Sequence, residues 1–558
     1  MDQREFLSRE TIYQIYPASF CDSNGDGWGD IRGIISKLDY IQSLGVGAIW
    51  LSPVYVSPMV DMGYDIADYR SIDPRFGTMR DFDDLMKECK KRHIKVIMDL
   101  VVNHTSSEHP WFKEAMRDRS SKYWEYYVIK PGKKGGKLPP NNWTTSFMTS
   151  AWSRVPEYPG MWYLHLYSPQ QPDLNWDNPS VLEEVEAIMN FWMDKGVFGF
   201  RCDVISEIYK SSFEDGKRRR LSQLDLPRGH EHFIAQDGCH RILKRIRKDV
   251  IEPRGGVLIG ECFGIDSDQA PKFLEGELDT LFSFPLVRVS GMLNTHTARP
   301  KKVKDILVEW QGKVDFNGNY LENHDQHRSV GKYCRSDAEY RVKGAKMLLT
   351  LLYSLRGGTF IFQGQELGAV DYPRLDRKDS HDFVAREVYR MFRRFGLLPG
   401  LAWKMARGVG RDDSRAPMAF SPDQGFGFTD PGVKPWQIFN PESKTINVDT
   451  EERDPNSVLH YFRRLVHLRR GVTPLGEGSI EFLTGIPKGV IGIRRESGSA
   501  ETITLVNMTT RTTRIPKKLK LQDWSALISN ADIVKDRLLP YQAVIYRRDA
   551  VKREESVR

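Results

Sequence analysis

Short apolar runs separated by amphipathic stretches make up most of the first 450 residues. The runs are rich in Val, Ile, Leu and aromatic residues, which is typical of strands buried on both faces. They cover residues 11–20, 48–55, 94–104, 199–204, 257–262, 318–325 and 359–364. Between them, apolar residues recur at helical spacing over residues 80–92, 181–195 and 238–249. This alternation predicts an α/β fold with a parallel sheet, either doubly wound or a (β/α)₈ barrel.

Two regions depart from the alternation. Residues 105–176 are dense in Pro, Gly and aromatic residues without helical spacing, which predicts a subdomain inserted after the third strand. From about residue 475 the pattern changes to short strands with turns, as in ETITLVNMT and LLPYQAVIYRR. That pattern predicts a C-terminal antiparallel domain.

Composition and charge exclude several classes of protein. The chain has 558 residues, 40% hydrophobic and 28% charged, which are globular values. Its 82 basic and 74 acidic residues are well mixed, so the net charge of +8 does not indicate nucleic-acid binding. No apolar run is long enough to span a membrane, and the N-terminus lacks the apolar segment of a secretory signal. We expect a cytoplasmic protein with reduced cysteines and favour a monomer.

Polar residues stand where several predicted strands end. Asp99 and His104 lie toward the end of the run 94–104, and Arg201 and Asp203 toward the end of the run 199–204. Glu261 lies near the end of the run 257–262, and His324 and Asp325 end the run 318–325. Because the carboxyl ends of parallel strands meet on one face, we expect these side chains to share a site. A single aspartate in such a position is often an N-cap or part of a buried ion pair, but that explanation fits the whole set poorly.

Several carboxylates with an arginine fit glycoside cleavage. One ionised carboxylate attacks the anomeric carbon, and a second, kept protonated by a raised pKa, protonates the leaving oxygen. Arg201 lies two residues from Asp203, so both point to the same face of a strand, and the guanidinium is expected to keep Asp203 ionised. Neither a P-loop nor a GxGxxG motif is present, and no organic cofactor is expected.

With these motifs in this order, the chain resembles the α-amylase family, glycoside hydrolase family 13, and within it the oligo-1,6-glucosidase and α-glucosidase group. The similarity runs from Ile12 to Arg547 and is carried by DLVVNH (99–104), GFRCDVI (199–205), GE (260–261), ENHDQ (322–326), QPDLNW (171–176) and DMGYDIADY (61–69). The resemblance implies a TIM barrel in two parts, 1–104 and 177–474, with subdomain B at 105–176 and a C-terminal β-sandwich at 475–558.

The resemblance also implies roles for individual residues. Asp203 would be the nucleophile, Glu261 the general acid/base and Asp325 the transition-state stabiliser. His104, Arg201 and His324 would line the glucose subsite. Asp65, beside Tyr64, would bind the non-reducing glucose and make the enzyme exo-acting, and Arg415 would pair with that aspartate. Among the aromatic residues of the insert, Phe147 and Tyr167 are expected to be pocket walls.

Linkage preference is expected to depend on the residue after the nucleophile, Val204. In this group valine is usual at that position in members that prefer α-1,6 bonds. The sequence departs from the group at His327, where proline is usual, and at Ala416 and residues 418–420, within the motif RTPMQW. These departures lie near the sugar-binding face. They affect the expected preference for the acceptor molecule, but not the roles expected for Asp203, Glu261 and Asp325.

The loop DSNGDGWGD (22–30) alternates oxygen-bearing side chains with glycines, a pattern that suits a hard cation. It is not an EF-hand, because its twelfth position is Gly33 rather than Glu. The loop resembles the family's calcium or magnesium site, which implies Asp22, Asn24, Asp26 and Asp30 as ligands, with Trp28 supplying a carbonyl. A bare Asx turn is the alternative.

The function expected is exo-acting, retaining hydrolysis of short α-1,6-linked oligosaccharides such as isomaltose. An α-1,4-preferring α-glucosidase stays open, as does a sucrose isomerase or transglucosylase that passes the glucosyl group to a sugar. A third alternative is the ectodomain of an amino-acid-transporter heavy chain. Such a protein needs a membrane span, which the sequence does not show, and does not need the carboxylates of Asp203, Glu261 and Asp325, which the sequence contains.

Overall fold

The fold is a closed barrel of eight parallel strands, in the order β1-β13-β12-β11-β10-β9-β5-β2. The computed structural model describes residues 2–145, 148–218, 226–291 and 297–549. The barrel strands are β1 (Thr11–Ile15), β2 (Ala48–Leu51), β5 (Lys95–Leu100), β9 (Gly199–Cys202), β10 (Val257–Glu261), β11 (Thr280–Phe282), β12 (Asn317–Asn319) and β13 (Gly357–Phe362). The expected TIM barrel is confirmed; β11 is absent from the strands expected from the sequence.

Aromatic side chains fill the interior of the barrel. The ring centroid of Phe282 lies 5.6 Å from that of Trp50 and 4.7 Å from that of Phe360. Because side chains alternate along a strand, the residue two places after an inward-facing apolar residue also faces inward. Ile259 belongs to this interior cluster, and Glu261 follows it at the end of β10. The apolar interior of the barrel thus borders directly on the polar residues at the strand ends.

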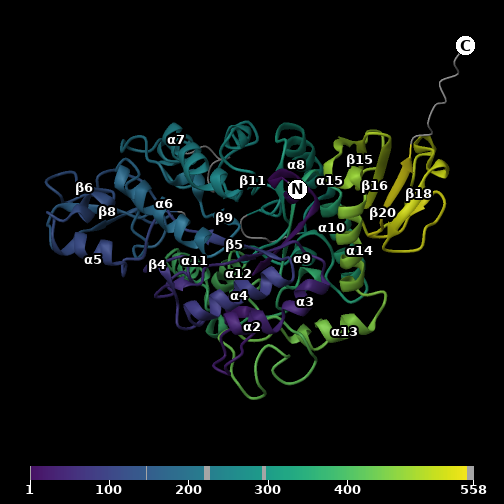
Figure 1. Ribbon diagram of the computed structural model, residues 1–558, viewed down its shortest axis with the longest axis horizontal. Coiled ribbons are helices and arrows are strands. Elements are labelled where there is room, and N and C mark those ends of the chain that lie inside the picture. Colours follow the sequence, from purple (N-terminus) through teal and green to yellow (C-terminus); the bar gives the residue numbers. More distant parts are fainter. Residues whose placement is uncertain (1, 146–147, 219–225, 292–296, 550–558) are drawn as a thin grey trace, which may run out of the picture.

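Helices cover the outside of the barrel (Figure 1). In α4, Thr78 and Asp81 form a capping box, and Phe82, Leu85 and Cys89 are buried at helical spacing. The helices between barrel strands are α2 (Ile31–Ser36), α3 (Leu38–Ser43), α4 (Met79–Lys91), α6 (Pro179–Asp194), α7 (Asp237–Ile246), α8 (Pro300–Lys313), α9 (Ser329–Tyr333) and α10 (Arg341–Tyr353). Two further helices flank the barrel, α1 (Gln3–Arg9) before β1 and α14 (Val458–Gly471) after β13.

Small sheets are inserted after the second and third barrel strands. A two-stranded sheet pairs β3 (Tyr55–Val56) with β4 (Asp68–Ile72). The larger insert after β5 holds α5 (Pro110–Arg117) and the antiparallel strands β6 (Ile129–Pro131), β7 (Trp152–Arg154) and β8 (Met161–Leu164). It forms the left end of the molecule in Figure 1, where β6, β8 and α5 lie.

The C-terminal domain lies at the opposite end of the long axis (Figure 1). Its antiparallel sheet has the order β14-β15-β16-β20-β18, and β17 and β19 form a second, two-stranded sheet. The strands are β14 (Ser479–Phe482), β15 (Val490–Ser497), β16 (Ala500–Asn507), β17 (Thr513–Arg514), β18 (Ser525–Ser529), β19 (Arg537–Leu538) and β20 (Ala543–Asp549). The short helix α15 (Thr473–Glu477) leads into it.

A long excursion separates β13 from α14. It contains the helices α11 (Phe383–Arg394), α12 (Pro399–Arg407) and α13 (Val448–Arg453), and its remainder is mostly turns. The sequence pattern did not single out this excursion, which supplies part of the site described below. Among the described residues, no helix is long and apolar enough to cross a membrane.

Candidate active site

Arg201 lies at the centre of a group of carboxylates at the ends of three adjacent strands. Its Nη1 contacts Asp99 Oδ1 and Asp203 Oδ1, each at 2.6 Å, and its Nη2 lies 2.6 Å from Glu261 Oε2. β9, which carries Arg201, pairs with β5 on one side and β10 on the other. One buried guanidinium therefore fixes three carboxylates, as expected from their positions at strand ends.

The two carboxyl groups expected to do the chemistry differ in acidity. Burial raises the pKa of Glu261 to about 8; Arg201 opposes the rise, and Asp203 and Asp325 add to it. Burial also raises the pKa of Asp203 to about 6, against the lowering effect of Arg201. The expectation that Arg201 keeps Asp203 ionised thus holds at neutral pH, although burial outweighs the guanidinium. At pH 7 Asp203 is mostly ionised and Glu261 mostly protonated.

Arg201 holds Asp203 and Glu261 next to each other, because its Nη1 lies 2.6 Å from Asp203 Oδ1 and its Nη2 lies 2.6 Å from Glu261 Oε2. One carboxyl group of such a pair can attack an anomeric carbon while the other protonates the leaving oxygen.

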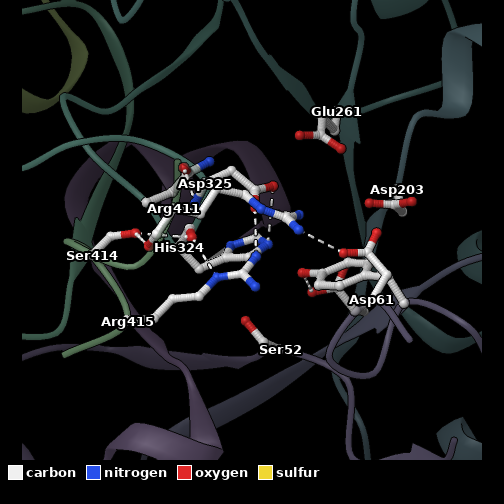
Figure 2. A network of polar contacts seen from close by, with 12 residues as sticks. Ser52, Asp61, Asp203, Glu261, His324, Asp325, Arg411, Ser414 and Arg415 are labelled. Atoms are coloured by element: carbon white, nitrogen blue, oxygen red, sulfur yellow. Dashed lines mark hydrogen bonds and ion pairs between the residues drawn. The ribbon is translucent and has the colours of Figure 1, made fainter. Parts of the chain in front are cut away.

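Asp325 faces this pair from the loop after β12 (Figure 2). Its Oδ1 lies 2.9 Å from Arg415 Nη2 and 3.3 Å from Arg411 Nη1, and its Oδ2 lies 3.2 Å from His324 Nε2. Burial raises the pKa of Asp325, but its neighbours His324, Arg411 and Arg415 lower it well below its usual range. Asp325 therefore stays ionised and presents a negative charge to the cavity.

The ion pair that closes one end of the site is Asp61–Arg411, not the expected Asp65–Arg415. Arg411 Nη2 lies 2.8 Å from Asp61 Oδ1, and Figure 2 shows Arg411 reaching from Asp325 to Asp61. Asp65 is fully buried and accepts hydrogen bonds from Ser57 Oγ and from the backbone N–H groups of Val60 and Asp61, so it holds its own loop together. Arg415 contacts Asp325 instead.

Asp61 and Arg411 are functional candidates that sequence reasoning missed. Asp61 opens the motif DMGYDIADY, and Arg411 lies four residues before Arg415 in RDDSR. DMGYDIADY offers three aspartates, and RDDSR offers two arginines. Only the fold decides which one faces the cavity.

Tyrosine and histidine side chains surround the carboxylates. The ring of Tyr64 stacks on that of His324, with 5.1 Å between the ring centroids, and the Tyr64 hydroxyl donates to Asp99 Oδ2. His104 Nε2 lies 3.0 Å from the carbonyl oxygen of Tyr64. Burial lowers the pKa of both histidines, that of His324 to about 3, so both are neutral at pH 7.

Tyr167 and Val204 line the cavity, as expected for Tyr167, whose hydroxyl donates to Glu207. Phe147 lies outside the described residues. Val204 follows Asp203 in a left-handed conformation with φ 37°, and its N–H donates to Glu261 Oε2 at 3.3 Å. This residue therefore contributes both its side chain and its backbone to the site.

The cavity that joins these groups has a volume of about 280 Å³. That is near the lower limit of small-molecule sites, about 300–1,000 Å³. Its lining includes Asp203, Glu261 and Asp325 together with Asp61 and Arg411. One small ligand beside all three carboxylates fits this space.

The predicted metal loop is a set of Asx turns. Asp22 Oδ1 accepts from the backbone N–H groups of Asn24 and Gly25, and Asp22 Oδ2 from that of Gly27. Asp26 Oδ1 accepts from the N–H of Trp28, and Asp30 from Ser23 and Gly33. Three carboxylates and an amide oxygen are the kind of donors that a hard cation prefers. Both oxygens of Asp26, and Asp30 Oδ2, accept a single hydrogen bond each and keep a lone pair for a cation, whereas each oxygen of Asp22 already accepts two.

Comparisons with known proteins identify relatives over the whole chain. Residues 14–478 match the family described as "Alpha amylase, catalytic domain". An oligo-1,6-glucosidase of Parageobacillus thermoglucosidasius is 38% identical over 98% of this chain and 99% of its own. A trehalose-6-phosphate hydrolase of Bacillus subtilis is 34% identical over 98% and 99%. The crystal structure of an isomaltulose synthase from Klebsiella sp. LX3 has a TM-score of 0.91, with 34% identity over 97% and 99%.

The family match agrees with the fold, which is a closed barrel of eight parallel strands with the expected carboxylates at its strand ends. The chain belongs to the α-amylase family, glycoside hydrolase family 13, in the group of oligo-1,6-glucosidases and α-glucosidases.

Proposed function

We propose that this protein is an exo-acting, retaining α-glucosidase that removes glucose from the non-reducing end of short α-1,6-linked oligosaccharides. The observation that carries the proposal is the Asp203–Glu261 pair held by Arg201, with one carboxyl group ionised and the other protonated at neutral pH. These are the protonation states that double displacement at the anomeric carbon requires.

In the first step, Asp203 attacks the anomeric carbon while Glu261 gives its proton to the departing glycosidic oxygen. A glucosyl ester of Asp203 forms, and the leaving group departs as an alcohol. In the second step, Glu261, now a carboxylate, takes a proton from water. That water attacks the anomeric carbon, releases α-glucose and frees Asp203.

Exo action is supported by the closed end of the cavity. The Asp61–Arg411 ion pair joins two loops that are 350 residues apart in the chain, and it stands beside Asp325. A sugar chain cannot continue past this pair, whereas the 4-hydroxyl of a terminal glucose can hydrogen-bond to it. This supports removal of single glucose units.

The α-1,6 preference is supported by Val204 and by the names of several relatives. Val204 lines the cavity directly after the nucleophile. Relatives at 36–38% identity are named oligo-1,6-glucosidase.

The test is a proton-NMR time course of isomaltose with purified enzyme, with Asp203→Asn as the blank. We expect α-glucose to appear first, and the variant to lose activity by orders of magnitude while its circular dichroism is unchanged. Initial release of β-glucose would contradict the retaining mechanism. Cleavage of maltose but not isomaltose would contradict the linkage.

Sucrose isomerisation is a second candidate, favoured by the TM-score of 0.91 to an isomaltulose synthase. In that reaction, fructose rather than water takes the glucosyl group from Asp203. Incubation with sucrose distinguishes the two functions, because an isomerase yields isomaltulose or trehalulose and a hydrolase yields free glucose and fructose.

We also propose that the loop formed by Asp22, Asn24, Asp26, Trp28 and Asp30 holds a structural Ca²⁺ or Mg²⁺ ion. The ion would tie together a loop that follows β1 and contains none of the catalytic groups. Its contribution would be stability rather than chemistry.

A further inference from the structure

Apolar side chains form part of the lining of the catalytic cavity. One group consists of Phe263, Phe284 and Val287, which follow β10 and β11. A second group consists of Val384, Val388 and Met391 on helix α11. These six residues are called the apolar clamp below.

The α11 half of the apolar clamp is fixed to the catalytic end of the cavity. Val384, Val388 and Met391 recur at helical spacing, so they lie on one face. Asp382 caps the helix by accepting from the N–H of Ala385, and it also accepts from Arg411 Nε at 2.8 Å. Because Arg411 also binds Asp61, it connects helix α11 to the end of the cavity where the terminal glucose is proposed to bind.

Two polar side chains described in the cavity lining, His327 and Lys332, already have partners. The ring nitrogens of His327 contact Asp371, Asp413 and the carbonyl oxygen of Gly408 at 3.2–3.3 Å. Lys332 Nζ donates to Gln326 Oε1. A hydroxyl group of a second sugar would have to compete for these two groups, and burying an unpaired hydroxyl is costly.

Arg288 also turns toward the clamp. Its guanidinium carbon lies 4.6 Å from the ring centroid of Phe263 and 5.3 Å from that of Phe284. The flat cation therefore stacks on the clamp's aromatic rings, a position that holds the rings in place.

The leaving group must lie next to this clamp. Glu261 protonates the glycosidic oxygen, and glucose lies toward Asp61 and Arg411, so the leaving group extends to the other side of Glu261. Phe263 is only two residues beyond Glu261 on that side. We infer that this enzyme preferentially cleaves α-glucosides whose leaving group is apolar, such as an alkyl or aryl alcohol. The inference rests on the proposed α-glucosidase activity.

The experiment compares methyl, butyl and hexyl α-D-glucopyranosides. These leaving groups are alcohols of similar acidity, so differences in kcat/KM report contacts rather than leaving-group chemistry. Complete burial of one methylene corresponds to about a 4-fold gain. We expect kcat/KM to rise about 2- to 4-fold per methylene from methyl to hexyl, and hexyl glucoside to surpass isomaltose.

The variants exchange apolar groups for polar groups of the same shape. Val384→Thr combined with Val388→Thr should reduce the gain per methylene, measured as the ratio of kcat/KM for hexyl α-glucoside to kcat/KM for methyl α-glucoside. Val308→Thr is the matched control, because Val308 is an exposed valine on α8. It should leave the series unchanged.

Several results would overturn the inference. One is a flat series in the unmodified enzyme; another is a rise that survives both threonine substitutions. If no glucoside is cleaved, the proposed function itself fails. Calorimetric binding of methyl and hexyl α-glucoside to Glu261→Gln then still tests the clamp, because equal affinities would contradict it.

Discussion

At the scale of single residues, Arg201 couples the titration of the carboxyl groups around it. It contacts Asp99, Asp203 and Glu261 at once, so each carboxylate is affected by the charge of the others. Groups that interact in this way titrate as a set rather than singly. The apparent pKa values of activity therefore belong to the cluster.

We expect kcat/KM to follow a bell-shaped pH profile. Activity falls below about pH 6 because Asp203, with its pKa raised to about 6 by burial, becomes protonated and cannot attack. It falls above about pH 8 because Glu261, with its pKa raised to about 8 by burial, loses the proton it must give. Steady-state kinetics from pH 4 to 10 on isomaltose measure both limbs.

Glu261→Gln provides the control for this assignment. With α-glucosyl fluoride, whose leaving group needs little protonation, the variant should release an initial burst of fluoride. The rate of this burst should not fall above pH 8. A fall above pH 8 would assign the upper pKa of the activity profile to a group other than Glu261.

A second prediction separates Asp61 from Asp65. Asp61→Asn should lower kcat/KM about 10- to 100-fold, because a hydrogen bond to a charged group contributes about 1.5–3 kcal/mol. Asp65→Asn should instead lower the free energy of unfolding by about 1–3 kcal/mol, because Asp65 bonds only its own loop. Kinetics and urea denaturation on both variants check this. A larger kinetic loss in Asp65→Asn would restore the pairing expected from the sequence.

Strand-end positions made most of these residues predictable. Asp203, Glu261 and Arg201 follow from the two-residue repeat along β9 and β10, which is a local property of the sequence. Asp61 and Arg411 did not follow, because both lie in loops and meet only through tertiary folding. Local patterns contain no information on which loop residue turns toward a cavity.

At the scale of elements, His327 joins three loops around the site. Its ring contacts Asp371 and Asp413, and Nε2 lies 3.2 Å from the carbonyl oxygen of Gly408, three residues before Arg411. Burial lowers the pKa of His327, but the two aspartates outweigh burial and raise it to about 10. The histidine is therefore a buried cation where the group usually has proline.

His327→Gln should destabilise the protein by about 3 kcal/mol near pH 6, since it leaves two carboxylates without their cation. The folded pKa of about 10 exceeds the unfolded value of about 6.5. The stabilisation is therefore complete below pH 6.5 and is lost as pH rises toward 10. Urea midpoints at pH 6 and pH 10 measure it, with exposed His467 changed to Gln as the control. A loss that does not depend on pH would contradict an ionised His327.

Most barrel elements followed from hydrophobic patterning, but β11 and α11 did not. β11 has only three residues, and the apolar residues after it continue into a loop, so no boundary is visible in the sequence. Helix α11 lies in the long excursion after β13, where neighbouring turns obscured its amphipathic pattern. The residues directly after β11 and helix α11 itself contribute to the apolar clamp, so the leaving-group side was the least predictable part of the site.

At the scale of the whole molecule, the barrel stands between the inserted subdomain and the C-terminal sheet (Figure 1). The excursion after β13 returns to the first loop of the chain, since Thr429 Oγ1 donates to Asp22 Oδ2 at 2.5 Å. The proposed cation loop thus links two distant parts of the sequence.

Removal of divalent cations should lower Tm without lowering kcat at temperatures where the protein stays folded. An ion present at 100 times its Kd stabilises the folded state by about 2.7 kcal/mol. Calorimetry with EDTA or CaCl₂, together with metal analysis, measures the effect. Asp26→Asn should abolish the response, whereas Asp39→Asn, at an exposed position elsewhere, should keep it. Equal Tm values with and without the ion would leave the loop as Asx turns alone.

The left-handed backbone at Val204 bears on how this enzyme can evolve. A β-branched residue with φ 37° costs about 1–3 kcal/mol of conformational strain, which glycine at the same position would relieve. Val204→Gly, at the position expected to govern linkage preference, would therefore relieve backbone strain and remove a side chain from the cavity lining in one substitution. A change of substrate preference that begins with glycine at this position does not lower backbone stability.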